Sequence, residues 1–403
     1  MSLACWLHRL GRLYTAQMRD RQVFKFVPSL VLLALLGLSS INTAWAKVET
    51  SQPQHKKTLK AHKPQHKKQQ ASRATTGHAY AQRAEALEWG NDLATRQNLP
   101  QTWVTAAISD ARMLPNVARL VTPSTKPTAK NWAAYRERFI EPRRIAAGLA
   151  FWQEHASDLA RAEHTYGVPA RIIVGILGVE TLYGQHTGSF RILDALATLA
   201  FDFPQTHPRA QERQAFFRQE LEHFLLMTHQ NRADPRSLKG SYAGAMGLPQ
   251  FMPSSWRRYA VDFDGDGHID LWNSTADAIG SVANYFRAFE WQAGQPTTFD
   301  VKVQSHPEQL EQLLLPDILP TFSAQTMQSL GLQLPSDAAQ YPGKLALIEL
   351  RNGEDAPSFV LGTENFYAVT RYNWSSYYAM AVIELGETIE RERQRLSITA
   401  QTQ

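Results

Sequence analysis

The chain has 403 residues, of which 43% are hydrophobic, so it can bury a core large enough for more than one subdomain. Its formal net charge is +5, but subtracting the +4 of residues 1–46 and the +7 of residues 47–77 leaves −6 for residues 78–403. The basic segments therefore lie outside the predicted fold, and the sequence argues against a nucleic-acid partner.

We expect residues 1–46 to be a secretory signal peptide. Basic residues at 19–25 precede an apolar run at 30–38, and the small residues Ala44 and Ala46 suit cleavage before Lys47. The apolar run is short for a membrane span, although an uncleaved N-terminal anchor is the alternative. After cleavage the chain would carry no membrane span and would be a soluble periplasmic protein.

The only cysteine, Cys5, precedes the apolar run, so the mature protein would have neither a disulfide nor a cysteine for lipid attachment. Residues 47–77 are rich in Lys, His and Gln and have almost nothing apolar to bury. We therefore expect this segment to be a disordered linker.

Helical spacing of apolar residues dominates the chain from 78 to 298. It predicts helices over 158–166, 169–183, 212–227 and 277–289. Short strands are then predicted over 301–303, 345–350 and 358–361, and a closing helix over 376–395. The sequence thus predicts a mainly α (α+β) protein with a helical part at 78–298, a small β-containing subdomain at 299–364, and a C-terminal segment at 365–403 that returns to the core.

Glu180 occupies an unfavourable position for a carboxylate. It follows Ile173, Ile176 and Leu177 on one stripe of a predicted helix. Apolar surroundings penalise the charged form and raise the pKa, which gives the protonated acid that cleavage of a glycosidic bond needs. The alternative is a buried structural Glu paired with Arg143 or Arg191.

Alternating aspartates at 262–266 resemble the front of an EF-hand loop. The loop residues are Asp262, Asp264, Asp266, Gly267 and His268, the last binding through its carbonyl. Asn273 stands where EF-hands have a bidentate Glu, so Asp277 is expected to close the site. We expect a structural Ca²⁺ or Na⁺ here and no cofactor for catalysis; an Asp/Gly-rich hairpin turn is the alternative.

The stretch 239–255 is rich in small residues and contains Ser241 and Gln250. Small residues allow close approach of the backbone to a ligand, and neutral polar groups suit sugars. A contact between helices explains the same stretch equally well.

Five motifs together resemble the lytic murein transglycosylase B family, in a soluble, non-lipidated form. They lie at 178–184, 191–199, 240–255, 260–268 and 365–373, and the resemblance covers roughly residues 78–395. It implies a lysozyme-like core with a helical subdomain and a small β-containing subdomain. It also implies cleavage of the MurNAc–GlcNAc β-1,4 bond of peptidoglycan glycan strands, with other cell-wall enzymes as possible partners.

By motif position, the resemblance implies that Glu180 is the single catalytic acid and base. The implied substrate-binding residues are Tyr135, Arg213, Ser241, Gln250, Tyr285, Tyr367 and Tyr372, and the implied metal ligands are Asp262, Asp264, Asp266, His268 and Asp277. The chain departs from the family in its missing lipobox cysteine, a longer segment 205–213, Glu212-Arg213 in place of two arginines, and a metal loop one residue longer.

The implied reaction forms 1,6-anhydroMurNAc through attack by the sugar's own C6 hydroxyl. A hydrolytic lysozyme is the second interpretation and would need another carboxylate, for which Asp194 and Asp202 are the nearby candidates in sequence. A non-catalytic peptidoglycan-binding protein of the envelope is the third.

Overall fold

The structure is a computed structural model that describes residues 77–122 and 130–401. The predicted signal peptide and nearly all of the predicted linker lie outside the described residues. The helices of the first half are η2 (Tyr80–Gln82), α3 (Ala84–Arg96), α4 (Gln101–Asp110), α5 (Pro115–Leu120), α6 (Trp132–Arg136), α7 (Pro142–Glu154), α8 (Ala156–Tyr166), α9 (Ala170–Thr181) and α10 (Ile192–Phe201). Those of the second half are α11 (Ala210–Gln230), α12 (Pro253–Tyr259), α13 (Thr275–Ala288), α14 (Pro307–Leu314), α15 (Ala324–Ser329), α16 (Ser336–Ala339), α17 (Glu364–Tyr372) and α18 (Ser376–Gln401).

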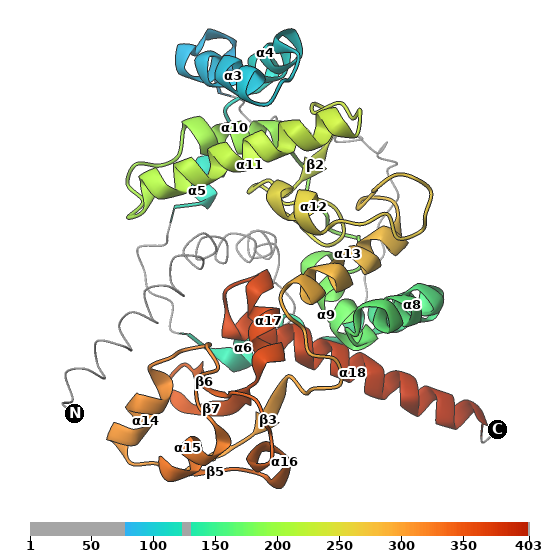
Figure 1. Cartoon of the computed structure of the whole chain (residues 1–403), viewed down its shortest axis with the longest axis vertical. Coiled ribbons are helices and arrows are strands. Elements are labelled where there is room, and N and C mark those ends of the chain that lie inside the picture. The colour runs from blue at the N-terminus through green and yellow to red at the C-terminus, as the bar shows by residue number, and fades with distance from the viewer. Residues whose placement is uncertain (1–76, 123–129, 402–403) are drawn as a thin grey trace, which may run out of the picture.

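The upper part of the molecule is a layer of paired helices (Figure 1). Helix α3 packs against α4, and α10 packs along α11, which in turn contacts α12. Helix α10 is buried along its whole length because it carries few polar side chains. Its Asp194 accepts a hydrogen bond from the Arg112 backbone at 2.9 Å, which ties the short loop after α4 to this layer.

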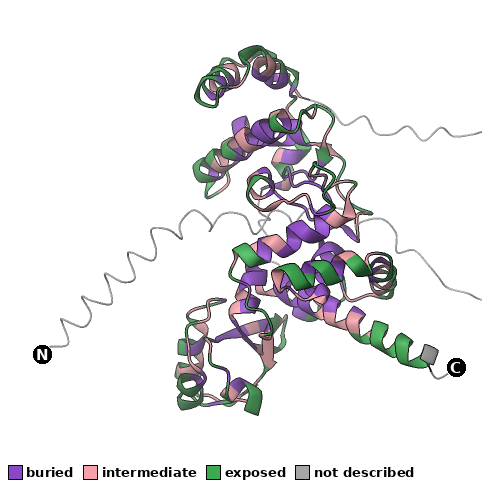
Figure 2. Cartoon of the chain, turned by 45° about the vertical axis from the view of Figure 1, so that its right-hand side comes forward, coloured by how far each residue is buried: buried purple, intermediate pink, exposed green. Residues whose placement is uncertain are grey.

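The centre of the molecule is the crossing of α9 and α18, with α7, α8 and α13 packed around α9. Two glycines permit a close approach of the two backbones. A Cβ at Gly175 would overlap the Val382 carbonyl oxygen, and a Cβ at Gly386 would overlap the Arg171 carbonyl oxygen. Figure 2 shows buried residues gathered in the middle of the molecule and the exposed end of α18 projecting from it.

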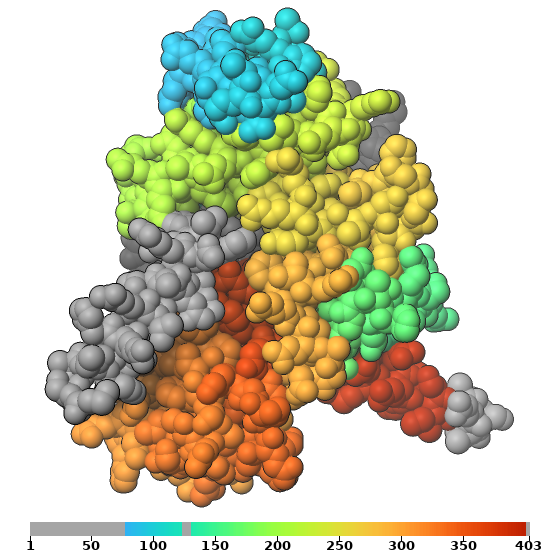
Figure 3. All heavy atoms as spheres, in the orientation of Figure 1, coloured from blue at the N-terminus to red at the C-terminus, as the bar shows by residue number. Residues whose placement is uncertain are grey.

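The strands form three small antiparallel sheets. They are β1 (Phe190–Arg191), β2 (Lys239–Gly240), β3 (Thr298–Asp300), β4 (Lys302–Val303), β5 (Leu332–Gln333), β6 (Ala346–Asn352) and β7 (Asp355–Gly362). The largest sheet has the order β3-β7-β6, with Leu347 opposite Leu361. Both leucines belong to a second hydrophobic cluster with Met327 and Tyr341, separate from the main core. This lobe lies at the bottom of the space-filling view (Figure 3).

Side-chain caps explain several of the helix starts. The Ser274 hydroxyl accepts a hydrogen bond from the Asp277 backbone at α13, and the Thr363 hydroxyl accepts from Asn365 at α17. Helix α8 ends at Gly167, whose φ of 72° suits a residue without a side chain.

The predicted mainly α, α+β fold is confirmed, and the predicted helices are found with ends shifted by a few residues. Pro169 precedes α9 instead of opening it, and α9 ends at Thr181 because Leu182 and Tyr183 take positive φ values. The predicted strand 301–303 is reduced to β4. Within the described residues, no helix combines the length and the apolar character needed to cross a membrane.

We expect Gly175→Ala to destabilise the protein by about 1–3 kcal/mol, because the added methyl group overlaps a backbone carbonyl that cannot swing aside. The free energy of unfolding from urea titration measures this effect. Gly90→Ala on α3 is the matched control, since its nearest neighbour is the Ile108 side chain at 3.3 Å and alanine is the better helix former. Equal effects at both positions would contradict the close crossing of α9 and α18.

Candidate active site

Glu180 lies in the last turn of α9 and is only 2% exposed. The helix buries almost every side chain because it is apolar on all sides, so the carboxyl group cannot turn toward solvent. After Thr181 the chain turns sharply through three residues with positive φ, Leu182, Tyr183 and Gly184. The Thr181 hydroxyl donates to the Leu248 carbonyl at 2.9 Å, which joins the end of α9 to the stretch 239–255.

The Tyr378 hydroxyl of α18 donates a hydrogen bond to Oε1 of Glu180. No hydrogen-bond partner within the described residues reaches Oε2. Burial raises the pKa of Glu180 to about 8, and the hydrogen bond from Tyr378 opposes this rise only in part. Glu180 is therefore a protonated acid at neutral pH, as the apolar stripe predicted.

Neither arginine that could have neutralised Glu180 does so. The Arg191 guanidinium binds Asp110 and Asp194, and Arg143 donates to Gln185 at 3.0 Å. The alternative, a structural Glu180 paired with Arg143 or Arg191, is therefore not what the structure shows. Phenol groups surround the carboxyl group instead: Tyr372 stacks on Tyr378 with ring centroids 6.3 Å apart.

Two of these aromatic side chains are fixed by hydrogen bonds to backbone. The Tyr372 hydroxyl donates to the Pro249 carbonyl at 2.5 Å, and the Tyr285 hydroxyl donates to the Arg371 carbonyl at 2.7 Å. Their rings lie 4.8 Å apart, between centroids. Burial, together with the nearby Glu180 charge, raises the pKa of Tyr372 and Tyr378, so both phenols stay neutral.

A cavity of about 100 Å³ opens beside Glu180. Of the predicted substrate-binding residues, Gln250, Tyr285 and Tyr372 line it. The Gln250 side chain donates to the carbonyls of Thr187 and Gly247, and its φ of 51° marks a tight turn at the cavity wall.

The other four predicted substrate-binding residues lie outside the lining of this cavity: Tyr135, Arg213, Ser241 and Tyr367. Tyr135 is buried, and the Glu180 charge adds to the burial that raises its pKa, so it lies near the acid. The buried Ser241 hydroxyl accepts backbone N–H groups of Ala243 and Ala245 and so shapes its own loop.

The sequence analysis missed Tyr378, which binds Glu180 from outside the lining of the cavity, and Glu220, which belongs to that lining. Tyr378 sits on a face of α18 that carries no motif. Glu220 of α11 lines the cavity, is 2% exposed, and stands among apolar residues as Glu180 does, so the same stripe argument could have found it. Burial raises its pKa to about 7, and its two oxygens accept the Ser254 hydroxyl at 2.6 Å and the Ser254 backbone N–H at 2.9 Å.

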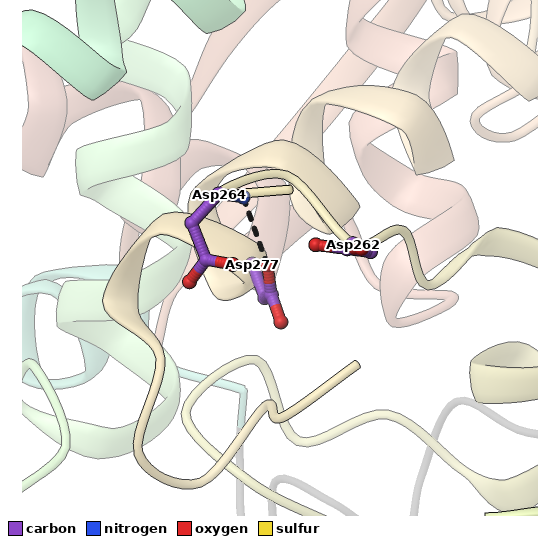
Figure 4. Close-up of side chains that lie close together, drawn as sticks. All are labelled: Asp262, Asp264 and Asp277. Carbon is purple, nitrogen blue, oxygen red and sulfur yellow. Dashed lines mark hydrogen bonds between the residues drawn. The ribbon is translucent and has the colours of Figure 1, made fainter. Parts of the chain in front are cut away.

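The metal loop brings three of its five predicted ligands together. Asp262, Asp264 and Asp277 each place one carboxylate oxygen within 4.8 Å of the others (Figure 4). Asp277 is buried and accepts backbone N–H groups of Phe263 and Asp270 at 2.7 and 2.8 Å, so it joins the loop to α13. The Asp266 carboxylate lies outside this group, and the His268 carbonyl stays a predicted ligand. Three converging carboxylates fit a hard cation that prefers oxygen ligands.

The chain is similar to known proteins over most of its described length. The family described as Transglycosylase SLT domain matches residues 81–387. Membrane-bound lytic murein transglycosylase B of Escherichia coli (strain K12) is 40% identical over 326 residues, which are 79% of this chain and 86% of that protein.

Two solved structures extend the similarity to the fold. The soluble lytic transglycosylase SltB1 from Pseudomonas aeruginosa has a TM-score of 0.69 and 42% identity, with 77% of this chain and 99% of that chain covered. The Escherichia coli lytic transglycosylase Slt35 in complex with calcium also has a TM-score of 0.69, with 39% identity, 80% of this chain and 98% of that chain covered.

We expect the stability difference between the wild type and Glu180→Gln to depend on pH. The folded-state pKa of about 8 is raised from 4.5, so the stability that the protonated acid provides is complete below pH 4.5 and is lost as the pH rises to about 8. Gln cannot ionise. Between these pH values the free energy of unfolding of the wild type should therefore fall by on the order of a few kcal/mol relative to that of the variant.

Urea unfolding at a series of pH values measures this difference. Leu177→Ala, one turn before Glu180, is the control, because it removes buried volume without removing a titrating group. It should lower the free energy of unfolding by the same amount at every pH. A pH-independent difference for Glu180→Gln would contradict the buried neutral acid.

Proposed function

The chain belongs to the lytic transglycosylase family with a Transglycosylase SLT domain and is a peptidoglycan lytic transglycosylase, and from this premise we propose that Glu180 is its single catalytic acid and base. The observation that carries the proposal is a protonated carboxyl group in the wall of a cavity, with one oxygen bound by Tyr378 and the other without a partner among the described residues. In this proposal the partnerless oxygen, Oε2, carries the proton that is given to the glycosidic bond.

The reaction has two halves that share this carboxyl group. In the first, Glu180 gives its proton to the oxygen between MurNAc and GlcNAc, and the C1–O bond breaks through an oxocarbenium-like state. In the second, the Glu180 carboxylate takes the proton of the MurNAc C6 hydroxyl as that oxygen bonds to C1. The products are a glycan ending in 1,6-anhydroMurNAc and a released GlcNAc end, and Glu180 is protonated again.

Tyr378 stabilises the Glu180 carboxylate between the two proton transfers. Its hydrogen bond favours the charged form of Glu180, which exists only after the first proton transfer. Intramolecular attack outcompetes water because the C6 hydroxyl is already placed, and such reactions reach effective molarities on the order of 10⁵ M or more.

A hydrolytic mechanism would use a second carboxylate. The two candidates from sequence are engaged elsewhere: Asp194 binds Arg191, and Asp202 binds Arg83. Glu220 does line the cavity, but both of its oxygens hold Ser254 at the start of α12. This geometry supports Glu220 as a structural cap and favours the single-acid mechanism.

We assign the substrate contacts in two groups. Gln250, Tyr285 and Tyr372 line the cavity and offer an amide and flat aromatic surfaces, which suit sugars. Tyr135, Arg213, Ser241 and Tyr367 are proposed only from the resemblance of their motifs. Peptidoglycan is the proposed partner, and a periplasmic location is proposed because murein lies there.

We also propose that Asp262, Asp264 and Asp277 hold a structural Ca²⁺, to which Asp266 and the His268 carbonyl are added by motif position. The related Slt35 structure in complex with calcium supports this ion for the family. The ion would neutralise three carboxylates that otherwise repel one another, and it would fix the loop to α13. None of the three carboxylates lines the cavity beside Glu180.

Digestion of murein sacculi should release muropeptides that end in 1,6-anhydroMurNAc, each one water lighter than a hydrolytic product. Glu180→Gln should lower the rate by at least roughly 10²-fold, because it removes the proton donor. Mass spectrometry of the products measures both. Exposed Glu88→Gln on α3 is the control for a lost charge. Reducing-end MurNAc as the main product would contradict the proposed transglycosylase reaction and indicate hydrolysis.

Added Ca²⁺ should raise the melting temperature, because only the folded chain brings the three carboxylates together. At about 100 times its Kd, the ion should stabilise the protein by about 2.7 kcal/mol. Asp264→Ala should abolish the effect, whereas exposed Asp92→Ala should retain it. Calorimetry with and without chelator measures the shift. Loss of activity on chelation at an unchanged melting temperature would point to a catalytic ion instead.

A further inference from the structure

A second hollow lies further along α11 and encloses about 620 Å³. Residues of α11 up to His223 line the cavity beside Glu180, whereas Met227 of α11 and Asn231, directly after its end, line this hollow. At the rise of an α-helix, those residues are roughly 6 and 12 Å beyond His223. The rest of its wall comes from the loop between α11 and β2, from β2 itself, from α12 and from the end of the metal loop. It is therefore a separate hollow near the active site.

A pair of tryptophans forms one side of this hollow. Trp256 of α12 is buried, and Trp272 is partly exposed beside it, with ring centroids 5.0 Å apart. The Trp272 indole N–H donates to the Lys239 carbonyl at 2.9 Å. These two contacts fix the plane of the Trp272 ring. Because the indole N–H is used internally, the ring offers the hollow an apolar surface.

The lining combines three neutral polar residues with three ionisable ones, Lys239, His268 and Asp270. Asn231, Ser237 and Asn273 supply amides and a hydroxyl. The lining carboxylate, Asp270, accepts the backbone N–H groups of Trp272 and Asn273 and the Asn273 side-chain amide, at 2.8 to 3.0 Å. Asp270 therefore holds its own loop. A flat apolar surface with amides and a hydroxyl at its edge matches a pyranose ring, which has an apolar face and hydroxyls around it.

We propose that this hollow is a second carbohydrate site, which holds an N-acetylated sugar of the murein glycan outside the catalytic cavity. The identity of the sugar rests on the proposed function. The sugar stacks on Trp272, and its hydroxyls and acetamido group bind Asn231 and Ser237. Leu238 and Ile269 lie in the same lining and receive the acetyl methyl group.

A second contact with the same polymer has a clear physical effect. Once one sugar is held here, the rest of its strand is confined near the catalytic cavity, so the local concentration of cleavable bonds rises without any change in the chemistry. The effect concerns glycan chains long enough to span both hollows, because a fragment too short to span them occupies only one at a time. Binding and turnover of sacculi should depend on Trp272, whereas turnover of a short soluble glycan should not.

The first experiment measures binding without cleavage, in Glu180→Gln protein. Co-sedimentation with sacculi should weaken roughly tenfold on Trp272→Ala, as is usual when an aromatic anchor is removed. Trp89→Ala, which removes a partly buried tryptophan of α3, is the matched control and should bind normally. The β-1,4-linked tetramer of N-acetylglucosamine should shift the Trp272 indole N–H resonance, assigned by its loss in Trp272→Phe. Normal sacculus binding by Trp272→Ala would overturn the proposal.

A second variant separates loss of the site from loss of the fold. Ala233→Trp fills the hollow and keeps Trp272, so it should weaken sacculus binding equally at an unchanged melting temperature. Stem-free glycan strands decide between sugar and stem peptide: the proposal requires the same loss on them, and a loss confined to peptide-bearing strands would overturn it.

With Glu180 intact, Trp272→Ala should lower kcat/KM on sacculi and leave it unchanged on a short soluble glycan. An equal fall on both substrates would contradict an accessory site. The binding measurements use an inactive variant, so a failure of the proposed chemistry, read from the products of the wild type, is distinguishable from a failure of this site.

Discussion

The site depends on the burial of one carboxyl group where α9 crosses α18. Gly175 and Gly386 let the two backbones approach, and this approach brings Tyr378 of α18 against Glu180 of α9. Transfer of a charged carboxylate into such a place costs much free energy unless a cation follows it. Within the described residues no arginine pairs with Glu180. The carboxyl group therefore stays protonated, because its charged form is unfavourable there. An acid that is protonated near neutral pH is thus a consequence of helix packing.

The C-terminal segment completes this arrangement. The β-containing lobe is inserted between α13 and α17, after which the chain returns to the centre through α17 and α18. Tyr372 of α17 reaches the Pro249 carbonyl, and Tyr285 of α13 reaches the Arg371 carbonyl. These hydrogen bonds join three segments that are distant in sequence around one cavity. The lobe has a small core of its own, while Ala346, Ile348 and Leu350 of β6 pack into the main core.

Sequence patterns predicted those features that depend on a single segment. The stripe of α9 predicted a buried Glu180, and the spacing after the aspartates predicted that Asp277 approaches Asp262 and Asp264. Features set by two segments could not be derived in this way. Tyr378 acquires its role only from the crossing angle of α18 on α9. Tyr135 and Tyr367, assigned by motif, lie outside the lining of the cavity because their side chains pack into neighbouring aromatic clusters.

The cavity contains two buried carboxyl groups, and their pKa values do not distinguish them. Burial raises the pKa of Glu180 to about 8 and that of Glu220 to about 7, so both groups titrate near neutral pH. Hydrogen bonding separates their roles. Glu220 uses both oxygens to hold Ser254, and any proton transfer from it would disturb the start of α12. Glu180 uses one oxygen for Tyr378 and keeps Oε2 available to a substrate. A buried carboxyl group can act as an acid only if one oxygen is spared from holding the fold, and Glu180 alone of the two satisfies this condition.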